Sequence, residues 1–269
     1  MIIDFHTHVF PDRIAEKTVS TLANAASITP YANGTAQALS DSMKRAGIDL
    51  SVNLPVLTSP KQFDSVLSFA KGINEAYEQG LCPIISFAGI HPMCDDIEGK
   101  IRLIKDSGFL GVKIHPDYQG AFINDEGYIR ILEAAKECDL IVVTHAGIDA
   151  AFREAGAKCP PKLAKEVVRK VKHPKFVLAH LGGSEQLNEV LEVLCGEDVY
   201  FDTAYSLPFT EDDVLHALIK RHGAEKILFA TDSPWGEQSA FAERIASLPI
   251  SAEDKNKIFS ENAKAILGM

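Results

Sequence analysis

The residues with the clearest chemical potential are His6 and His8, at the end of an apolar run that begins at Ile2. On a β-strand, residues two apart point to the same face, so the two imidazoles would stand side by side. Each ring brings an N–H and a lone pair that need partners, whereas one divalent cation satisfies both lone pairs at once. The pair therefore indicates a metal site, although His-x-His alone also occurs in solvated loops.

Other short β-branched runs also end in polar residues that could bind a metal. They are LCPIISFAGIHP (81–92), FLGVKIHPDY (109–118), LIVVTHAG (140–147), KFVLAHLGG (175–183) and ILFATDSPW (227–235). Six of the nine histidines lie at such ends: His6, His8, His91, His115, His145 and His180. We interpret the other three, His173, His216 and His222, as surface residues.

Two further runs, LSVNLPVL (50–57) and VYFDTAYS (199–206), complete a series of strands starting near residues 2, 50, 82, 109, 140, 175, 199 and 227. Stretches with helical periodicity separate them. Strands that alternate with amphipathic helices predict a parallel sheet, and eight such units in this length predict a (β/α)8 TIM barrel spanning 1–269 as a single domain. A doubly wound open sheet is the alternative, but no GxGxxG follows the first strand.

In such barrels the functional site lies at the C-terminal ends of the strands, so His6, His8, His145, His180 and Asp232 should converge there. Counting back by two from Asp232, His145 and His180 gives inward columns of apolar or small residues: Ala230 and Leu228, Val143 and Ile141, Leu178 and Phe176. By the same counting Asp4 should share the face of His6 but lie deeper, in a buried hydrogen-bond role.

Two long connections border this expected site. The first, after His8, exceeds what one helix needs, and we expect its segment 9–34 to cover the barrel mouth as a lid. The second, GIDAAFREAGAKCPP (147–161), carries Arg153. Arg153 would be either a solvated loop charge or a clamp for a substrate carboxylate.

Composition excludes several classes. The 269 residues are 46% hydrophobic, enough for one large core, and the formal net charge of −10 without a run of like charges argues against a nucleic-acid partner. Five widely spaced cysteines without CxxC are typical of a reducing compartment. No apolar segment reaches membrane-spanning length. We therefore expect a soluble cytoplasmic protein that has no membrane partner, and a homodimer is compatible with this interpretation.

Together these motifs resemble the amidohydrolase superfamily. DFHTH at 4–8, THAG around His145, LAHLGG around His180, TDSPWG around Asp232 and the terminal IFSENAKAILG are similar to its amidohydrolase-related (amidohydrolase 2) branch, which includes aminocarboxymuconate semialdehyde decarboxylase. The resemblance implies a metal held by His6, His8, His145 and Asp232. It also implies that His180 either orients the metal-bound water or binds a second metal. Three imidazoles and one carboxylate leave a position open for water, as catalytic sites do.

GVKIHPDY and GIHP also resemble TatD-type metal-dependent hydrolases, in which a glutamate stands where this chain has Lys113. An ammonium beside divalent cations is unfavourable, so Lys113 is either carboxylated, as in binuclear members of the superfamily, or directed away from the metal toward an acid or a substrate anion. We expect the free amine and one tightly bound metal. His115, two residues further, is either a substrate contact or a hydrogen-bonded loop residue.

We therefore expect an enzyme that acts on a small molecule. Lys113, His115 and Arg153 would contact this substrate, and their positive charges are compatible with an anionic one. The cofactor would be one divalent ion, zinc first, with manganese, iron or nickel as alternatives. The first hypothesis is a hydrolase: Asp232 takes a proton from metal-activated water as it attacks an amide, lactone or ester, and His180 stabilises the developing oxyanion. A non-oxidative decarboxylase of a small carboxylic acid is the alternative, a TatD-like nuclease the third, and a non-catalytic metal-binding protein the fourth.

Overall fold

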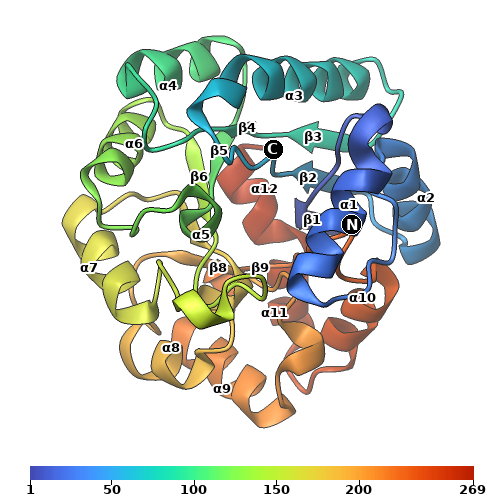
Figure 1. Cartoon of the computed structure of the whole chain (residues 1–269). Helices are drawn as coiled ribbons and strands as arrows, with labels where there is room; N and C mark the ends of the chain where they lie inside the picture. Colours follow the sequence, from blue (N-terminus) through green and yellow to red (C-terminus); the bar gives the residue numbers. More distant parts are fainter.

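The computed structural model describes residues 1–269, and its strands form a closed parallel barrel (Figure 1). The strands are β1 (Ile3–Thr7), β2 (Leu50–Asn53), β3 (Ile84–Ser86), β4 (Ala88–Gly89), β5 (Gly111–Ile114), β6 (Ile141–Thr144), β7 (Phe176–Leu178), β8 (Tyr200–Asp202) and β9 (Ile227–Leu228). β3 and β4 are two halves of the third strand, interrupted at Phe87, whose N–H still bonds to Asn53 O at 2.9 Å. Eight strand positions result, as the sequence predicts.

The last strand returns to the first and closes the barrel. Phe5 N donates to Phe229 O at 2.9 Å, and Asp232 N donates to His6 O at 2.8 Å. The second of these bonds places Asp232 beside His6, although the two lie at opposite ends of the chain. The fold is the TIM barrel that the repeat predicts.

Most helices surround the strands, whereas α12 (Asn262–Leu267) lies across the middle of the ring, as Figure 1 shows. The others are α1 (Asp12–Ala26), α2 (Ala36–Ala46), α3 (Phe63–Glu78), α4 (Ile97–Asp106), α5 (Pro116–Gln119), α6 (Glu126–Glu137), α7 (Pro161–Val171), α8 (Leu187–Val193), α9 (Asp212–His222), α10 (Gln238–Ser247) and α11 (Ala252–Asn256). No helix combines the length and apolar character that crossing a bilayer requires.

Two apolar clusters hold these layers together. The inner cluster fills the barrel with side chains that alternate along the strands, such as Phe5, Val52 and Val143, and α12 packs against it with Ile266. The larger cluster lies between the strands and the surrounding helices. Inward and outward residues therefore follow the period of two that strand geometry imposes.

The residues predicted to face the barrel interior are confirmed for two strands and wrong for a third. Val143 with Ile141, and Ala230 with Leu228, belong to the inner cluster, as predicted. Leu178 and Phe176 belong instead to the outer cluster, so the predicted phase of β7 is wrong. His180 has a φ of 59°, and this left-handed turn breaks the alternation just before the histidine.

The predicted phase of Asp4 is wrong as well. The register of β1 against β2 shifts between Asp4 and Thr7, a β-bulge that changes which side chains face inward. Ile3 and Phe5 face the inner cluster, whereas Asp4 bonds to Gln238 at the start of α10. Asp4 does have the buried hydrogen-bond role expected of it, but on the other side of the strand from His6.

Candidate metal centre and substrate cavity

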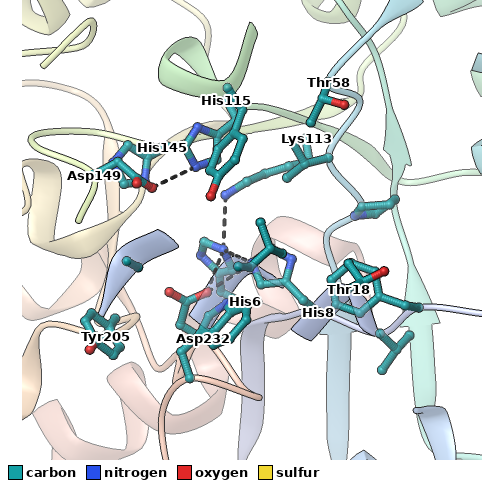
Figure 2. Close-up of a pocket in the computed structure, with 18 of the residues that line it drawn as sticks. His6, His8, Thr18, Thr58, Lys113, His115, His145, Asp149, Tyr205 and Asp232 are labelled. Atoms are coloured by element: carbon teal, nitrogen blue, oxygen red, sulfur yellow. Dashed lines mark hydrogen bonds and ion pairs between the residues drawn. The ribbon is translucent and has the colours of Figure 1, made fainter. Parts of the chain in front are cut away.

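His6, His8 and Asp232 meet at the C-terminal end of the barrel. One nitrogen of each histidine and one carboxylate oxygen lie within 4.8 Å of one another. His8 Nε2 is 3.0 Å and His6 Nε2 3.5 Å from Asp232 Oδ1, and the two Nε2 atoms are 3.2 Å apart. Figure 2 shows the three side chains converging at the floor of a cavity.

The other ring nitrogen of each histidine, Nδ1, already forms a hydrogen bond. His6 Nδ1 lies 2.8 Å from Asp202 Oδ2 and His8 Nδ1 2.9 Å from Leu54 O, so both Nδ1 atoms carry the proton and donate it. Both Nε2 atoms are then acceptors, like Asp232 Oδ1, which is buried without a hydrogen bond, and the Nε2 of His6 has a donor beside it, Lys113 Nζ at 3.0 Å. Three electron-rich atoms this close repel one another unless a cation lies among them, so the residues fit a divalent metal.

Electrostatics agree with this arrangement. Burial alone would raise the pKa of Asp232, but His6 and His8 hold it below its usual range. Burial and the nearby Lys113 ammonium lower the pKa of His6 well below its usual value. The carboxylate is therefore charged and the imidazole neutral, which are the forms that bind a metal.

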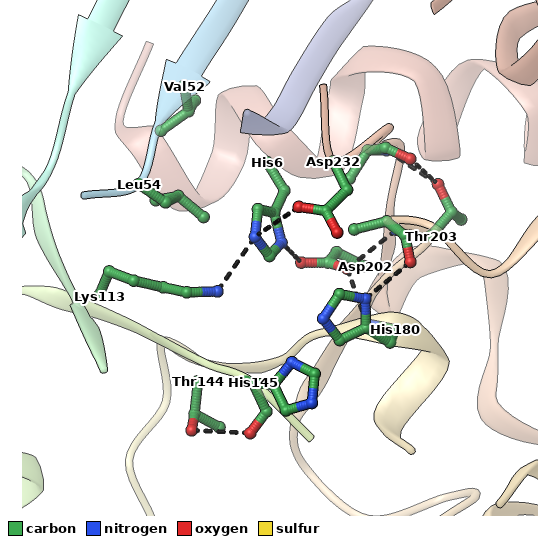
Figure 3. Close-up of polar contacts among 12 residues, drawn as sticks. His6, Val52, Leu54, Lys113, Thr144, His145, His180, Asp202, Thr203 and Asp232 are labelled. Atoms are coloured by element: carbon green, nitrogen blue, oxygen red, sulfur yellow. Dashed lines mark hydrogen bonds and ion pairs between the residues drawn. The ribbon is translucent and has the colours of Figure 1, made fainter. Parts of the chain in front are cut away.

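Lys113 is buried and does not turn away from this group. Its Nζ lies 3.0 Å from His6 Nε2, contrary to the expected direction (Figure 3). Burial lowers the pKa of Lys113 to about 8, while Asp202 and Asp232 oppose the change. At neutral pH the floor of the cavity thus contains a cation beside the metal-binding residues.

His145 lies in a second group rather than in the first. Its ring stacks on that of His115 with centroids 4.3 Å apart, and the two histidines form a candidate ligand group with Asp149. His145 Nε2 is buried without a hydrogen bond, 3.9 Å from Asp117 Oδ2, which also lacks one. The assignment of His145 to the first metal therefore stays a prediction.

His180 connects the two groups. Its ring centroid is 4.5 Å from that of His145 and 5.6 Å from that of His6. Nδ1 lies 2.8 Å from Ala204 O, to which it donates, so Nε2 is the atom that can gain or lose a proton. His180 and Asp232, with φ values of 59° and 64°, are two of the few non-glycine residues in the left-handed region, the kind of strain that collects at functional sites.

The cavity above these residues has a volume of about 480 Å³. His115 and Lys113 line it, whereas Arg153 does not: its guanidinium pairs with Glu185, with Nη2 2.6 Å from Oε1. The cation that the sequence analysis missed is Arg13, at the start of α1, which lines the cavity and forms no ion pair. No signal in the sequence distinguishes Arg13 from other surface arginines.

Asp202 and Asp149 were also missed. Asp202 ends β8 in the run VYFDTAYS, where an acid at a strand end was a usable signal of the kind that revealed Asp232. Asp149 follows His145 by four residues in a loop, and its Oδ2 lies 3.5 Å from His115 Nε2. Burial opposes ionisation of Asp149, but His115 keeps its pKa below the usual value.

The chain belongs to the amidohydrolase family, because the Amidohydro_2 family model, described as an amidohydrolase, matches residues 82–269. No curated protein sequence matches it. Its fold is similar to that of a solved 2,6-dihydroxybenzoate decarboxylase in complex with 2,6-dihydroxybenzoate, at 16% identity and a TM-score of 0.72 over 100% of this chain and 99% of the other.

Two further solved structures share the fold. One is an amidohydrolase II protein, at 17% identity, a TM-score of 0.74 and full coverage of both chains. The other is a dihydroxybenzoic acid decarboxylase from Polaromonas sp. with bound manganese and the inhibitor 2-nitroresorcinol, at 16% identity, a TM-score of 0.70 and coverage of 99% and 96%. At these identities the likeness concerns the fold.

Proposed function

We propose that this protein is a divalent-metal-dependent, non-oxidative decarboxylase of a small carboxylic acid. The observation that carries the proposal is Lys113 Nζ, buried 3.0 Å from His6 Nε2 at the floor of the cavity. A cation next to a metal centre binds an anionic group far better than a neutral amide or lactone. The structural likeness to two decarboxylases of hydroxylated benzoic acids supports a carboxylate as that group.

His6, His8 and Asp232 would hold the metal, with His145 as the further ligand that the family resemblance implies. When bound, the ion would supply positive charge that polarises the oxygen atoms of the substrate. Lys113 would hold the carboxylate from the floor. Arg13 and His115 would contact the acid from the cavity walls, and Arg153 would act only indirectly, through Glu185.

Decarboxylation breaks the bond between the carboxylate and its carbon, releases CO2 and leaves that carbon to accept a proton. His180 would deliver it: because Nδ1–H donates to Ala204 O, a proton carried on Nε2 is the one the ring would give up, which leaves the neutral Nδ1–H tautomer. The apolar side chain of Ile148 also lines the cavity and would help to exclude water from the reacting carbon.

A hydrolase is the second candidate. The observation in its favour is the unpartnered Oδ1 of Asp232, which could take a proton from an attacking water. We do not propose a nuclease, because Arg13 and Lys113 are the only lysine or arginine residues that line the cavity, too few for a polyanionic backbone.

A paired assay separates the two candidates. Manganese- or zinc-loaded protein is incubated with hydroxylated benzoic acids, monitored for released CO2, and with amides, esters and lactones of similar size, monitored for ring opening or acid release. The proposal predicts CO2 from at least one acid and no hydrolysis above the metal-free control. Hydrolysis without CO2 would support the second candidate.

A further inference from the structure

α1 carries two neighbouring stripes of mostly apolar residues, and protein fully covers only one of them. The covered stripe consists of Ala15, Val19 and Ala23. The other recurs every four residues, which places it on one side of the helix, and it consists of Ile14, Thr18, Leu22 and Ala26. All four of these residues line the cavity, and Ile14 remains 45% exposed.

The cavity also has apolar lining residues outside α1. Val66 and Phe69, three residues apart on α3, line the same cavity with Val56, which follows β2, and Ile28, which follows α1. We call the space bordered by Ile14, Leu22, Ile28, Val56, Val66 and Phe69 the apolar annex. None of its wall residues is charged. Figure 2 shows Thr18 and Thr58 on the side of the cavity opposite Asp149 and Tyr205.

The annex is continuous with the floor, because one cavity of about 480 Å³ is lined by both. A cavity with a few convergent polar groups at one end and an apolar remainder is the usual form of a site that orients a ligand by its polar group and buries its apolar body. A single benzoate ring held at Lys113 would leave the annex to water. The half-buried side chains of Val66 and Phe69 would then contact water, whereas an apolar group of the substrate in the annex would cover them.

We propose that the annex binds a hydrocarbon extension, alkyl or aryl, carried by the acid whose carboxylate lies at the floor. The natural substrate is then a carboxylic acid with an apolar substituent of several carbons. This inference rests on the proposed function for the carboxylate, but the annex itself is independent of the reaction.

Calorimetric titration of the manganese-loaded protein tests it with two probe series. The first consists of 2-hydroxybenzoates with hydrogen, methyl, propyl or pentyl at ring position 4 or 5. The second consists of the matching alkylphenols without the carboxylate. Burying one CH2 contributes about 0.8 kcal/mol, so Kd should fall about fourfold per methylene over the first few carbons in at least one positional series.

Two matched variants on α1 locate the effect. Thr18→Trp fills the annex, so the dependence on chain length should disappear while the affinity for unsubstituted 2-hydroxybenzoate stays within about twofold. Thr21→Trp makes the same change on the exposed side of the helix and should leave the dependence intact. Circular dichroism checks that both variants are folded.

The results separate this inference from the proposed function. If affinity rises with chain length in both series and Thr18→Trp abolishes this rise, the annex is supported. If the acids bind no more tightly than the matching phenols, the carboxylate adds no affinity, and that result would count against the decarboxylase but not against the annex. Flat affinities across both series, or a dependence that persists in Thr18→Trp, would overturn the annex.

Discussion

Asp202 Oδ2 lies 2.8 Å from His6 Nδ1, and Oδ1 of the same carboxylate accepts hydrogen bonds from the backbone N–H groups of His180 and Ala204 at 2.9 and 3.0 Å. One buried acid therefore fixes the tautomer of His6 and the position of His180. Figure 3 shows Asp202 between the two rings. A carboxylate behind a ligating histidine makes that histidine a better ligand.

Asp202→Asn should accordingly weaken metal binding by about 10- to 100-fold, the usual effect of removing such a partner. Metal affinity is measured by competition with a chelator of known affinity. Asp198→Asn, at an exposed acid that pairs with Lys226 shortly before β8, is the control and should not change the affinity. Equal affinities for Asp202→Asn and the unmodified protein would show that His6 needs no acid behind it.

Thr231 anchors the left-handed turn at Asp232. Its N–H and hydroxyl both donate to Asp4, at 3.0 and 2.5 Å, and Gln238 Nε2 donates to the same carboxylate at 2.7 Å. Thr231→Val keeps the shape but leaves a buried carboxylate short of one donor, so the free energy of unfolding should fall by about 1–3 kcal/mol.

Urea denaturation measures this change, with the exposed Thr21→Val as control. Metal affinity should fall as well, because Asp232 loses its fixed position. A stability loss of only a few tenths of a kcal/mol would mean that Asp4 is satisfied without the hydroxyl.

Lys113 should be a free amine. The Nζ that lies 3.0 Å from His6 Nε2 then binds the substrate carboxylate, so Lys113→Met should raise KM for an acid substrate much more than it changes metal content. Metal analysis of the unmodified protein should give about one ion per chain, with or without added bicarbonate. Two ions per chain together with a carbamate mass increment on Lys113 would contradict this prediction and would assign His180 to a second metal.

His222 should make the fold sensitive to acid. It is buried, its Nε2 donates to Val199 O at 2.9 Å and its ring stacks on Phe201, and burial lowers its pKa from 6.5 to about 4. In the unfolded chain His222 binds a proton near pH 6.5, whereas in the folded chain its pKa is about 4 and it stays neutral until the pH approaches that value. This contribution to stability is therefore complete above pH 6.5 and is lost as the pH falls to 4, by up to about 3 kcal/mol.

Melting temperatures between pH 7 and pH 4 check this prediction. His222→Gln should flatten the acid-side decrease, whereas His216→Gln, at an exposed position on the same helix, should not. Identical slopes for the two variants would place the acid sensitivity elsewhere.

The sequence predicted most of the barrel because its periodic features are local. Apolar runs that end in a polar residue predicted the order of the parallel strands. They also predicted that His6, His8 and Asp232 converge at the ends of these strands. The phase of β7 and the side of Asp4 could not be predicted, since the turn at His180 and the bulge in β1 depend on how neighbouring strands pair.

The sequence pattern also did not predict which histidines are buried. His173 and His222, interpreted as surface residues, are buried, whereas His216 is exposed as expected. The contacts of His222 with Val199 and Phe201 depend on how α9 packs against β8, which the sequence does not show. Arg13 could not be singled out because its place in the cavity wall depends on where α1 lies over the barrel.

The metal centre of His6, His8 and Asp232, with Lys113 beside it, should remove CO2 from a carboxylic acid. The most direct measurement is mass-spectrometric detection of 13CO2 from carboxyl-labelled 2,6-dihydroxybenzoate and its alkylated analogues, using manganese-loaded protein, protein stripped by chelator, and the His6→Ala, His8→Ala double variant. We predict 13CO2 from the loaded protein with at least one acid, loss of at least about a hundredfold in the other two samples, and recovery when metal is restored to the stripped protein. No 13CO2 from any acid with fully loaded protein, or equal release from the double variant, would contradict the claim.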